Sequence, residues 1–142
     1  MAALWRKYLA AYLGAGLAMA ALDAVWLTLA NKPVYRQALQ TLLAPDFRLG
    51  PAVAFYLVYL LGVMVFAVKP ALAAGVWRTA AGLGGLFGFF AYATYDLTNQ
   101  ATLAVWPVWL SAIDITWGTC LTAICATVGF LTGRRFGASK PG

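Results

Sequence analysis

Three aspartates are the residues of this chain best suited to chemistry. Asp23, Asp96 and Asp114 are three of its four acidic residues, and each lies in a long apolar stretch without Lys or Arg. An ionisable side chain inside a membrane span is energetically costly and normally marks a functional site. Carboxylates in such a setting could bind a cation, transfer protons or coordinate a metal ion.

Each aspartate is followed three positions later by a polar or aromatic residue, and residues at this spacing share one face of a helix. The pairs are Asp23 with Trp26, Asp96 with Asn99, and Asp114 with Trp117. Tyr92 lies one turn before Asp96, so that Tyr92, Asp96 and Asn99 form a polar stripe. Gly85 and Gly88 on the same segment would let a neighbouring helix approach closely. The pattern is specific for a polar chamber and weak for any particular reaction.

The composition is that of a polytopic membrane protein. Hydrophobic residues make up 63% and charged residues 10% of the 142 residues, and the mean hydropathy is +0.80. A transmembrane helix needs about 20 residues to cross about 30 Å of hydrocarbon. We therefore expect residues 1–142 to form one all-α domain, with spans at about 8–29, 51–68, 79–99 or beyond, and 108–132. Lys69-Pro70 should close the second span, and a basic tail should begin at Gly133.

The cations are distributed unevenly between the two ends of these spans. Three fall on one side, namely Lys32, Arg36 and Arg48, against seven on the other, namely Arg6, Lys7, Lys69, Arg78, Arg134, Arg135 and Lys140. The positive-inside rule then places both termini in the cytoplasm. The net charge of +6 follows from this topology, with some attraction to anionic lipid, and gives no indication of nucleic-acid binding. The alternative is a signal peptide cleaved near Ala18-Met19-Ala20, which would remove Asp23.

The rise of a helix predicts that the three aspartates lie at one level. Asp23 lies six residues before Leu29, and Asp114 six residues after Val108. At about 1.5 Å per residue, both should lie roughly 9 Å below the outer boundary, with Asp96 at a similar or shallower depth. The alternative role is structural, because polar groups also hold membrane helices together through hydrogen bonds of about 0.6 to 2 kcal/mol. For Trp26, Trp106 and Trp109 the alternative role is an interfacial aromatic belt.

The segment from Pro33 to Leu43 is predicted to form a short interfacial helix. Its apolar face would hold Tyr35, Ala38, Leu39 and Leu42, and its polar face Arg36, Gln37, Gln40 and Thr41. It could cover the chamber and, with Arg48, bring a cation to the aspartates, or simply anchor the chain at the interface. Asp46 should face water.

Cysteine and histidine usage excludes several chemistries. Cys120 and Cys125 are five residues apart on one predicted helix, so they point to different faces, cannot pair with each other and are expected to pack as small residues. The chain has no His and no CxxC motif, which leaves soft-metal, haem and thiol-redox sites with little support.

Four motifs carry a resemblance to a known family. They are Leu22-Asp23-Ala24-Val25-Trp26-Leu27, Tyr95-Asp96-Leu97-Thr98-Asn99-Gln100-Ala101-Thr102, Trp106-Pro107, and Asp114-Ile115-Thr116-Trp117-Gly118. In this order they resemble the bacterial membrane protein family called domain of unknown function 2177, over nearly the whole chain. The resemblance implies a four-helix protein of the bacterial inner membrane, with the motif residues as defining positions. It implies no activity.

The first functional hypothesis is a binding or transport site for a cation or a cationic, lipid-like small molecule. Three carboxylates in a low-dielectric chamber need protons, a bound cation or the loop arginines to compensate their charge. Asp23, Asp96 and Asp114 would hold the ligand, with Trp26, Tyr92 and Trp117 as aromatic walls. If the ligand is a metal ion, oxygen donors from the three aspartates and Asn99 favour Mg²⁺, Ca²⁺ or Mn²⁺. Transport through four short helices would require a homodimer.

Two further hypotheses remain open, so the sequence leaves it uncertain whether the protein is an enzyme. A membrane enzyme acting on a lipid could use one of Asp23, Asp96 and Asp114 as general acid and another as base or metal ligand. No activated nucleophile and no cofactor motif supports it. An accessory subunit could instead use the polar cluster to bind a partner helix.

Overall fold

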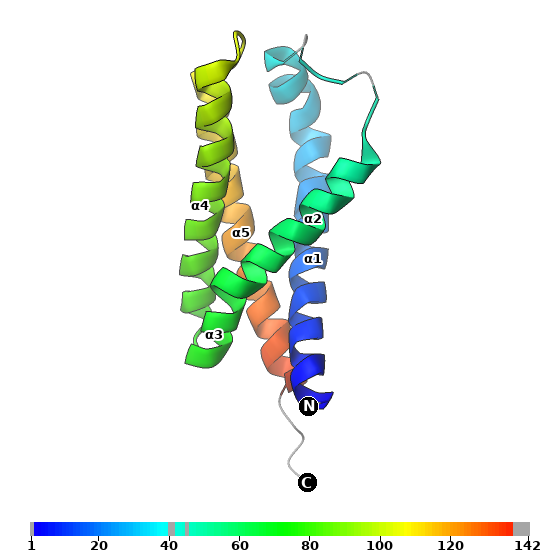
Figure 1. Ribbon diagram of the computed structural model, residues 1–142, viewed down its shortest axis with the longest axis vertical. Helices are drawn as coiled ribbons and strands as arrows, with labels where there is room; N and C mark the ends of the chain where they lie inside the picture. The colour runs from blue at the N-terminus through cyan, green and yellow to red at the C-terminus, as the bar shows by residue number, and fades with distance from the viewer. Residues whose placement is uncertain (1, 40–41, 45, 138–142) are drawn as a thin grey trace.

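The chain folds into a bundle of long helices, as the sequence predicts (Figure 1). A computed structural model describes residues 2–39, 42–44 and 46–137, and contains no β-strand within them. The elements are α1 (Ala2–Ala30), the π-helical turn η1 (Asn31–Arg36), α2 (Leu49–Val63), the π-helical turn η2 (Met64–Val68), α3 (Lys69–Ala74), α4 (Trp77–Thr102) and α5 (Val108–Gly137).

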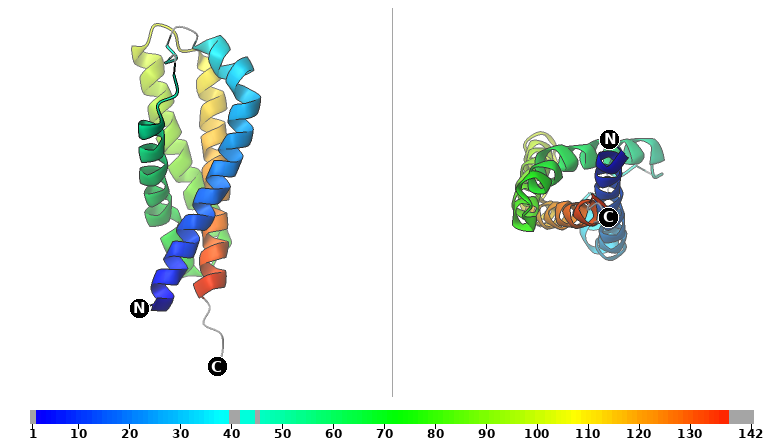
Figure 2. Two further views of the ribbon diagram at one scale, coloured as in Figure 1. Left: turned by 90° about the vertical axis from the view of Figure 1, so that its right-hand side faces the viewer. Right: turned by 90° about the horizontal axis from the view of Figure 1, so that it is seen from below.

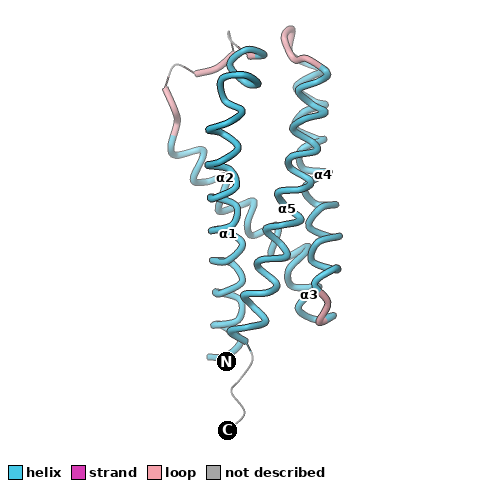
Figure 3. The backbone as a smooth tube through the Cα atoms, turned by 180° about the vertical axis from the view of Figure 1, so that it is seen from behind, coloured by secondary structure: helices cyan, strands magenta, loops and turns pink. Residues whose placement is uncertain are grey.

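Helix α5 makes the most extensive helix contacts in the bundle. It packs along both α1 and α4, and these are the two most extensive helix pairings in the molecule. Seen from below in Figure 2, the continuous helix from α2 to α3 crosses the side of the bundle opposite α5. In the tube view of Figure 3, α1 begins and α5 ends at the same end of the bundle. The fully buried side chains of Met19, Val63, Leu121 and Phe130 join α1, α2 and α5 in the core.

Glycines permit the close approach of α4 and α5. A Cβ atom on Gly84 would lie 2.6 Å from the Cβ of Ala126, and one on Gly88 would meet the backbone carbonyl of Gly118. Membrane helices commonly use small residues in this way. The prediction for Gly88 is confirmed. The prediction for Gly85 is wrong, because a Cβ there would make only ordinary contacts and Gly84 has the close approach instead.

The second helical stretch continues past the predicted stop at Lys69-Pro70 and ends at Ala74. In a regular α-helix the Pro70 ring would clash with a carbonyl one turn earlier. The π-helical turn η2 directly precedes this proline and widens the helix there. The stop comes instead at Gly75, whose φ of 72° ends α3 and whose N–H donates to the Ala71 carbonyl at 2.8 Å.

The ends of α1 and α5 also lie beyond the predicted boundaries. Helix α1 starts at Ala2 and α5 runs to Gly137, so the prediction of a basic tail from Gly133 is wrong for residues 133–137. Arg134 and Arg135 occupy the last turn of α5, where positive charge stabilises the helix dipole. Residues 138–142, which include Lys140, lie outside the described residues.

Three stretches of the described chain are long and apolar enough to cross a membrane, whereas the sequence predicts four. They are Leu4–Ala30, Leu49–Ala74 and Val108–Gly137. The predicted span at 79–99 falls within α4, which is long enough at 26 residues but not apolar enough. The reason is its second half, which carries Thr94, Asp96, Thr98, Asn99, Gln100 and Thr102.

The predicted interfacial helix is replaced by a continuation of α1. The chain passes from Ala30 directly into η1 and then turns over the end of the bundle, where Ala38 and Leu39 pack against Leu110. Arg36 and Gln37 are exposed as predicted, whereas Leu42, expected on the apolar face, is exposed as well. Gln40 and Thr41 lie outside the described residues.

The predictions for the loop residue Asp46 and for the two cysteines are confirmed in part. Asp46 and Arg48 are both exposed, which agrees with the prediction for Asp46. Cys120 and Cys125 are both free. Cys125 is buried in the core as expected, but Cys120 is exposed, so the prediction that both pack as small residues holds only for Cys125.

Candidate functional site

The end of the bundle covered by η1 holds three buried aspartates. We call Asp23, Asp96 and Asp114, together with the aromatic residues Trp26, Tyr92 and Trp117, the carboxylate chamber. The exposed fractions of the three aspartates are 9%, 0% and 5% in that order. All three come from long helices, and the structure gives each a different environment.

Asp114 is bonded to a residue that the sequence analysis did not assign to the site. The Tyr35 hydroxyl donates a hydrogen bond to Asp114 Oδ1 and accepts one of 3.0 Å from Trp26 Nε1. Burial, the bond to Asp114 and the nearby charges of Asp114 and Asp96 raise the pKa of Tyr35, against a smaller opposite effect of the Trp26 N–H. The phenol therefore stays a neutral donor at physiological pH.

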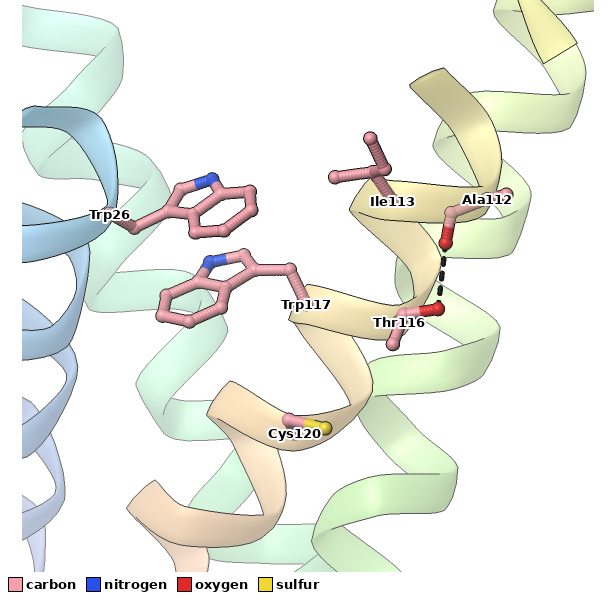
Figure 4. A pocket seen from close by; sticks show the side chains of 6 residues that line it. All are labelled: Trp26, Ala112, Ile113, Thr116, Trp117 and Cys120. Carbon is pink, nitrogen blue, oxygen red and sulfur yellow. Dashed lines mark hydrogen bonds between the residues drawn. The ribbon is translucent and has the colours of Figure 1, made fainter. Parts of the chain in front are cut away.

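Trp26 and Trp117 stack on each other between α1 and α5. Their ring centroids are 4.4 Å apart and the planes are inclined by 10° (Figure 4). Helices α1 and α5 run in opposite directions, and each aspartate stands three residues before its tryptophan, so the stack places Asp23 and Asp114 on opposite sides of it, roughly 9 Å apart along the bundle. The prediction that the aspartates lie at one level is therefore wrong for this pair. The Trp117 indole N–H is buried and has no hydrogen-bond partner within the described part of the chain.

Asp23 links α1 to α2. Its Oδ2 accepts a hydrogen bond of 2.7 Å from the Tyr56 hydroxyl. Helix α2 otherwise contacts α1 sparsely, and the other side-chain hydrogen bond between them runs from the Tyr12 hydroxyl to the Leu57 carbonyl at 3.3 Å. Asp23 thus holds the middle of α2 against the bundle.

Asp96 is the aspartate without a visible partner. It is fully buried, and neither carboxylate oxygen has a hydrogen-bond partner among residues 2–39, 42–44 and 46–137. On either side of it along α4, Tyr92 and Asn99 are half-buried. The Tyr92 ring lies against Gly118 and meets the Tyr59 ring edge-on, with centroids 6.4 Å apart. Burying a polar group without a partner is costly, so Asp96 is the group whose charge the described residues leave uncompensated.

A second set of polar bonds lies where α4 passes into α5. Trp106 Nε1 donates to Ser111 Oγ, and Ser111 Oγ donates to Gln100 Oε1, both at 3.1 Å. Trp106 also meets the Tyr95 ring edge-on at 5.7 Å. Trp106 is therefore held by one hydrogen bond and one ring contact, which a simple aromatic belt does not require.

The sequence analysis missed Tyr35 and Tyr56 as site residues. It placed Tyr35 only on the apolar face of a surface helix, and Tyr56 lies in an apolar stretch between Phe55 and Leu57. The signal that could have found both is general, because a buried tyrosine hydroxyl usually has a hydrogen-bond partner. Neither position indicates which aspartate that partner is.

The structure does not gather a metal cluster from the predicted donors. No group of three or more His, Cys, Asp or Glu side chains in the described residues is placed to hold a metal ion. Asp23 and Asp114 instead accept hydrogen bonds from two different tyrosines, while Asp96 accepts none within the described ranges. The predicted Mg²⁺, Ca²⁺ or Mn²⁺ site remains an untested prediction.

Two cavities adjoin the chamber. One, of about 540 Å³, has the tryptophan stack as one wall (Figure 4), and its lining consists of Trp26, Ala112, Ile113, Thr116, Trp117 and Cys120. The other, of about 420 Å³, lies between α2 and α4 and is lined by Phe55, Tyr59, Ala91, Tyr92 and Tyr95. Both volumes are in the range of small-molecule sites, about 300 to 1,000 Å³.

A family model described as "Predicted membrane protein (DUF2177)" matches residues 8–131. The chain belongs to this family. The resemblance drawn from the four motifs is thereby confirmed, and the matched range contains every member of the carboxylate chamber. No curated protein and no solved structure matches the chain. Membership in this family therefore identifies a membrane protein and leaves its activity to be argued from the site.

Proposed function

We propose that this membrane protein binds a cationic or cationic, lipid-like small molecule in the carboxylate chamber. The observation that carries the proposal is Asp96, which is fully buried and whose two carboxylate oxygens have no hydrogen-bond partner in the described part of the chain. A buried carboxylate requires a counter-charge, a proton or polar partners. A cationic ligand would supply the counter-charge and the missing partner together.

The aromatic residues of the chamber suit the same class of ligand. Cations with quaternary or alkylated ammonium groups bind to the faces of Trp and Tyr rings. Trp26 and Trp117 offer a stacked pair that lines a cavity, and Tyr92 lies one helical turn from Asp96. Carboxylates beside aromatic faces favour an alkylated cation over a small, strongly hydrated one.

The proposal includes a fourth span and a bacterial inner-membrane location with both termini in the cytoplasm. Helix α4 misses the apolarity of a span mainly through Asp96, Asn99 and Gln100, and to a smaller extent through its threonines. Thr94, Thr98 and Thr102 each donate to a carbonyl four residues earlier at 2.7, 2.5 and 2.7 Å. Their hydroxyls are satisfied within the helix, which is what a lipid-facing position demands. The close packing of Gly84 and Gly88 on α5 supports placing α4 beside it across the membrane.

The test is ligand-dependent thermal stability of the protein purified in a neutral maltoside detergent. Dodecyltrimethylammonium is compared with an uncharged dodecyl amphiphile at the same mole fraction, and with Mg²⁺, Ca²⁺ and Mn²⁺. A ligand that binds only the folded state at 100 times its Kd stabilises by about 2.7 kcal/mol. We expect the ammonium amphiphile to raise the apparent Tm of the wild type and not of Asp96→Asn.

The matched control is Asp46→Asn, which removes the one aspartate that is exposed and lies outside the chamber. This variant should respond to the ammonium amphiphile like the wild type. If the wild type and both variants respond equally, or if none responds, the chamber does not bind a cation and the proposal is wrong. Stabilisation by a divalent metal that requires Asp96 would assign the site to a metal ion instead.

A further inference from the structure

A cavity at the end of the bundle opposite the carboxylate chamber has no role in the proposal above. It has a volume of about 640 Å³ and lies between the first half of α1 and the helical stretch that runs from α2 through η2 to α3. Its lining consists of Leu4, Trp5, Tyr8, Leu9, Tyr12, Leu61, Met64, Val65 and Lys69. One cation, three aromatic rings and five aliphatic or thioether side chains therefore share one groove.

The lining is ordered from polar to apolar along the helices. Lys69 is exposed at one end of the groove, and Leu61 lies eight positions earlier on the same helical stretch. At about 1.5 Å per residue, this separation corresponds to roughly 12 Å along the helix. One leaflet of hydrocarbon is about 15 Å thick, half of the membrane core. The apolar part of the groove thus has the length and direction of an acyl chain beside the protein.

The end of the groove that contains Lys69 lies on a positively charged surface. The described cations at this end of the bundle are Arg6, Lys7, Lys69, Arg78, Arg134 and Arg135, whereas all four acidic residues of the chain lie toward the other end. Lys7 does not line the groove; its side chain lies near Gly137 of α5, with its Nζ 6.0 Å from the centroid of the ring of Tyr8, which is a lining residue. Basic pockets between membrane helices on the cytoplasmic side are places where anionic lipid head groups bind.

We infer that this groove is a binding site for one phospholipid with an anionic head group. The phosphate would be held by Lys69 with Lys7 nearby, and one acyl chain would lie along Leu9, Leu61 and Val65. Trp5 and Tyr8 would take the interfacial level between head group and chain, where such rings are favoured. This site is independent of the carboxylate chamber and of whatever ligand the chamber binds.

The test uses the full chain in a neutral maltoside detergent. Its apparent Tm is measured against increasing mole fractions of phosphatidylglycerol, and of phosphatidylcholine with the same acyl chains. Phosphatidylglycerol should stabilise the wild type more strongly. Lys69→Gln should weaken its apparent affinity about fivefold, the effect of one lysine near an anionic head group. Arg78→Gln is the control, because Arg78 is an exposed cation at the same end that does not line the groove.

A second pair of variants tests the acyl-chain part without changing the charge. Val65→Trp fills the groove, whereas Val58→Trp places the same ring on an exposed position outside its lining. Only Val65→Trp should lose the phosphatidylglycerol response, by about tenfold or more in apparent affinity.

Three results would overturn the inference. Equal weakening by Lys69→Gln and Arg78→Gln would mean diffuse attraction to a basic surface. Equal stabilisation by glycerol phosphate, which has no acyl chain, would mean a simple anion site. An unchanged response in Val65→Trp would mean that no chain occupies the groove.

Discussion

The pair Asp96 and Asp114 allows a prediction in which one substitution has opposite effects at two buried aspartates. Asp96 is fully buried, and neither of its carboxylate oxygens has a hydrogen-bond partner among the residues that the structure describes. Asp114, at 5% exposure, accepts a hydrogen bond from Tyr35. Valine is close to aspartate in size, so Asp96→Val removes an unsatisfied group and should stabilise the ligand-free protein by about 1 to 3 kcal/mol. Asp114→Val leaves the Tyr35 hydroxyl without its acceptor and should destabilise by a similar amount.

The helix-propensity cost of valine applies to both variants, so the difference between them is the informative quantity. We expect Asp96→Val to be more stable than Asp114→Val by about 2 kcal/mol or more. The measurement is the apparent Tm of each purified variant in neutral detergent, without added cation or lipid. The reverse order would show that Asp96 makes stabilising interactions inside the folded protein. It would then be a packing residue, and the main support for a ligand in the chamber would be lost.

Three other predictions concern the bundle itself. In the same thermal assay, Gly88→Ala should destabilise the protein by at least about 1 to 3 kcal/mol, because the added Cβ meets a backbone carbonyl of α5 that cannot rotate away. Gly82→Ala is the control and should be neutral or slightly stabilising, because a Cβ there has nothing within 4 Å. Equal effects would contradict the packing of α4 on α5. Tyr56→Phe should lower the free energy of unfolding by about 0.6 to 2 kcal/mol, because it removes the hydrogen bond that joins α2 to Asp23. It should also speed hydrogen exchange of the backbone amides in α2 relative to α5. Unchanged exchange would mean that this bond does not hold α2. Reporter fusions should place the two ends of the chain on the cytoplasmic side, as four spans require. If the two ends lie on opposite sides of the membrane, the chain crosses it three times and α4 is not a span.

The features that the sequence predicts well are those that depend on one helix at a time. The spacing of Asp23 and Trp26, and of Asp114 and Trp117, sets which face of each helix they share. The stack of the two indoles agrees with this placement on the helix faces. Such placements follow from helix geometry alone. The common height predicted for the two aspartates is wrong, because it depends on how the antiparallel helices α1 and α5 are shifted along each other, which the rise per residue does not determine.

The features that the sequence could not predict depend on how two segments meet. Tyr56 bonds Asp23 across 33 positions and Tyr35 bonds Asp114 across 79, and no periodicity within one helix determines these pairings. The sequence also could not predict that the helix continues through Pro70. The residue type indicates a stop, and the π-helical turn η2 that accommodates the proline is visible only in the backbone. Hydropathy places α4 below the level of a membrane span, and it takes no account of whether a threonine hydroxyl bonds within the helix, as those of Thr94 and Thr102 do.

The distribution of charge along the bundle connects the two proposed sites. Asp23, Asp96 and Asp114 are buried toward one end, and the cations of α1, α3 and α5 lie at the other. Each end therefore needs a partner of opposite sign, and the two partners differ in where they come from. A membrane that is rich in anionic lipid on its cytoplasmic side already supplies one to the basic end. The buried carboxylates need a proton, polar partners or a cation, and the ammonium ligand that we propose would supply the cation, which is why we look for a ligand in the chamber and for an anionic lipid at the opposite end.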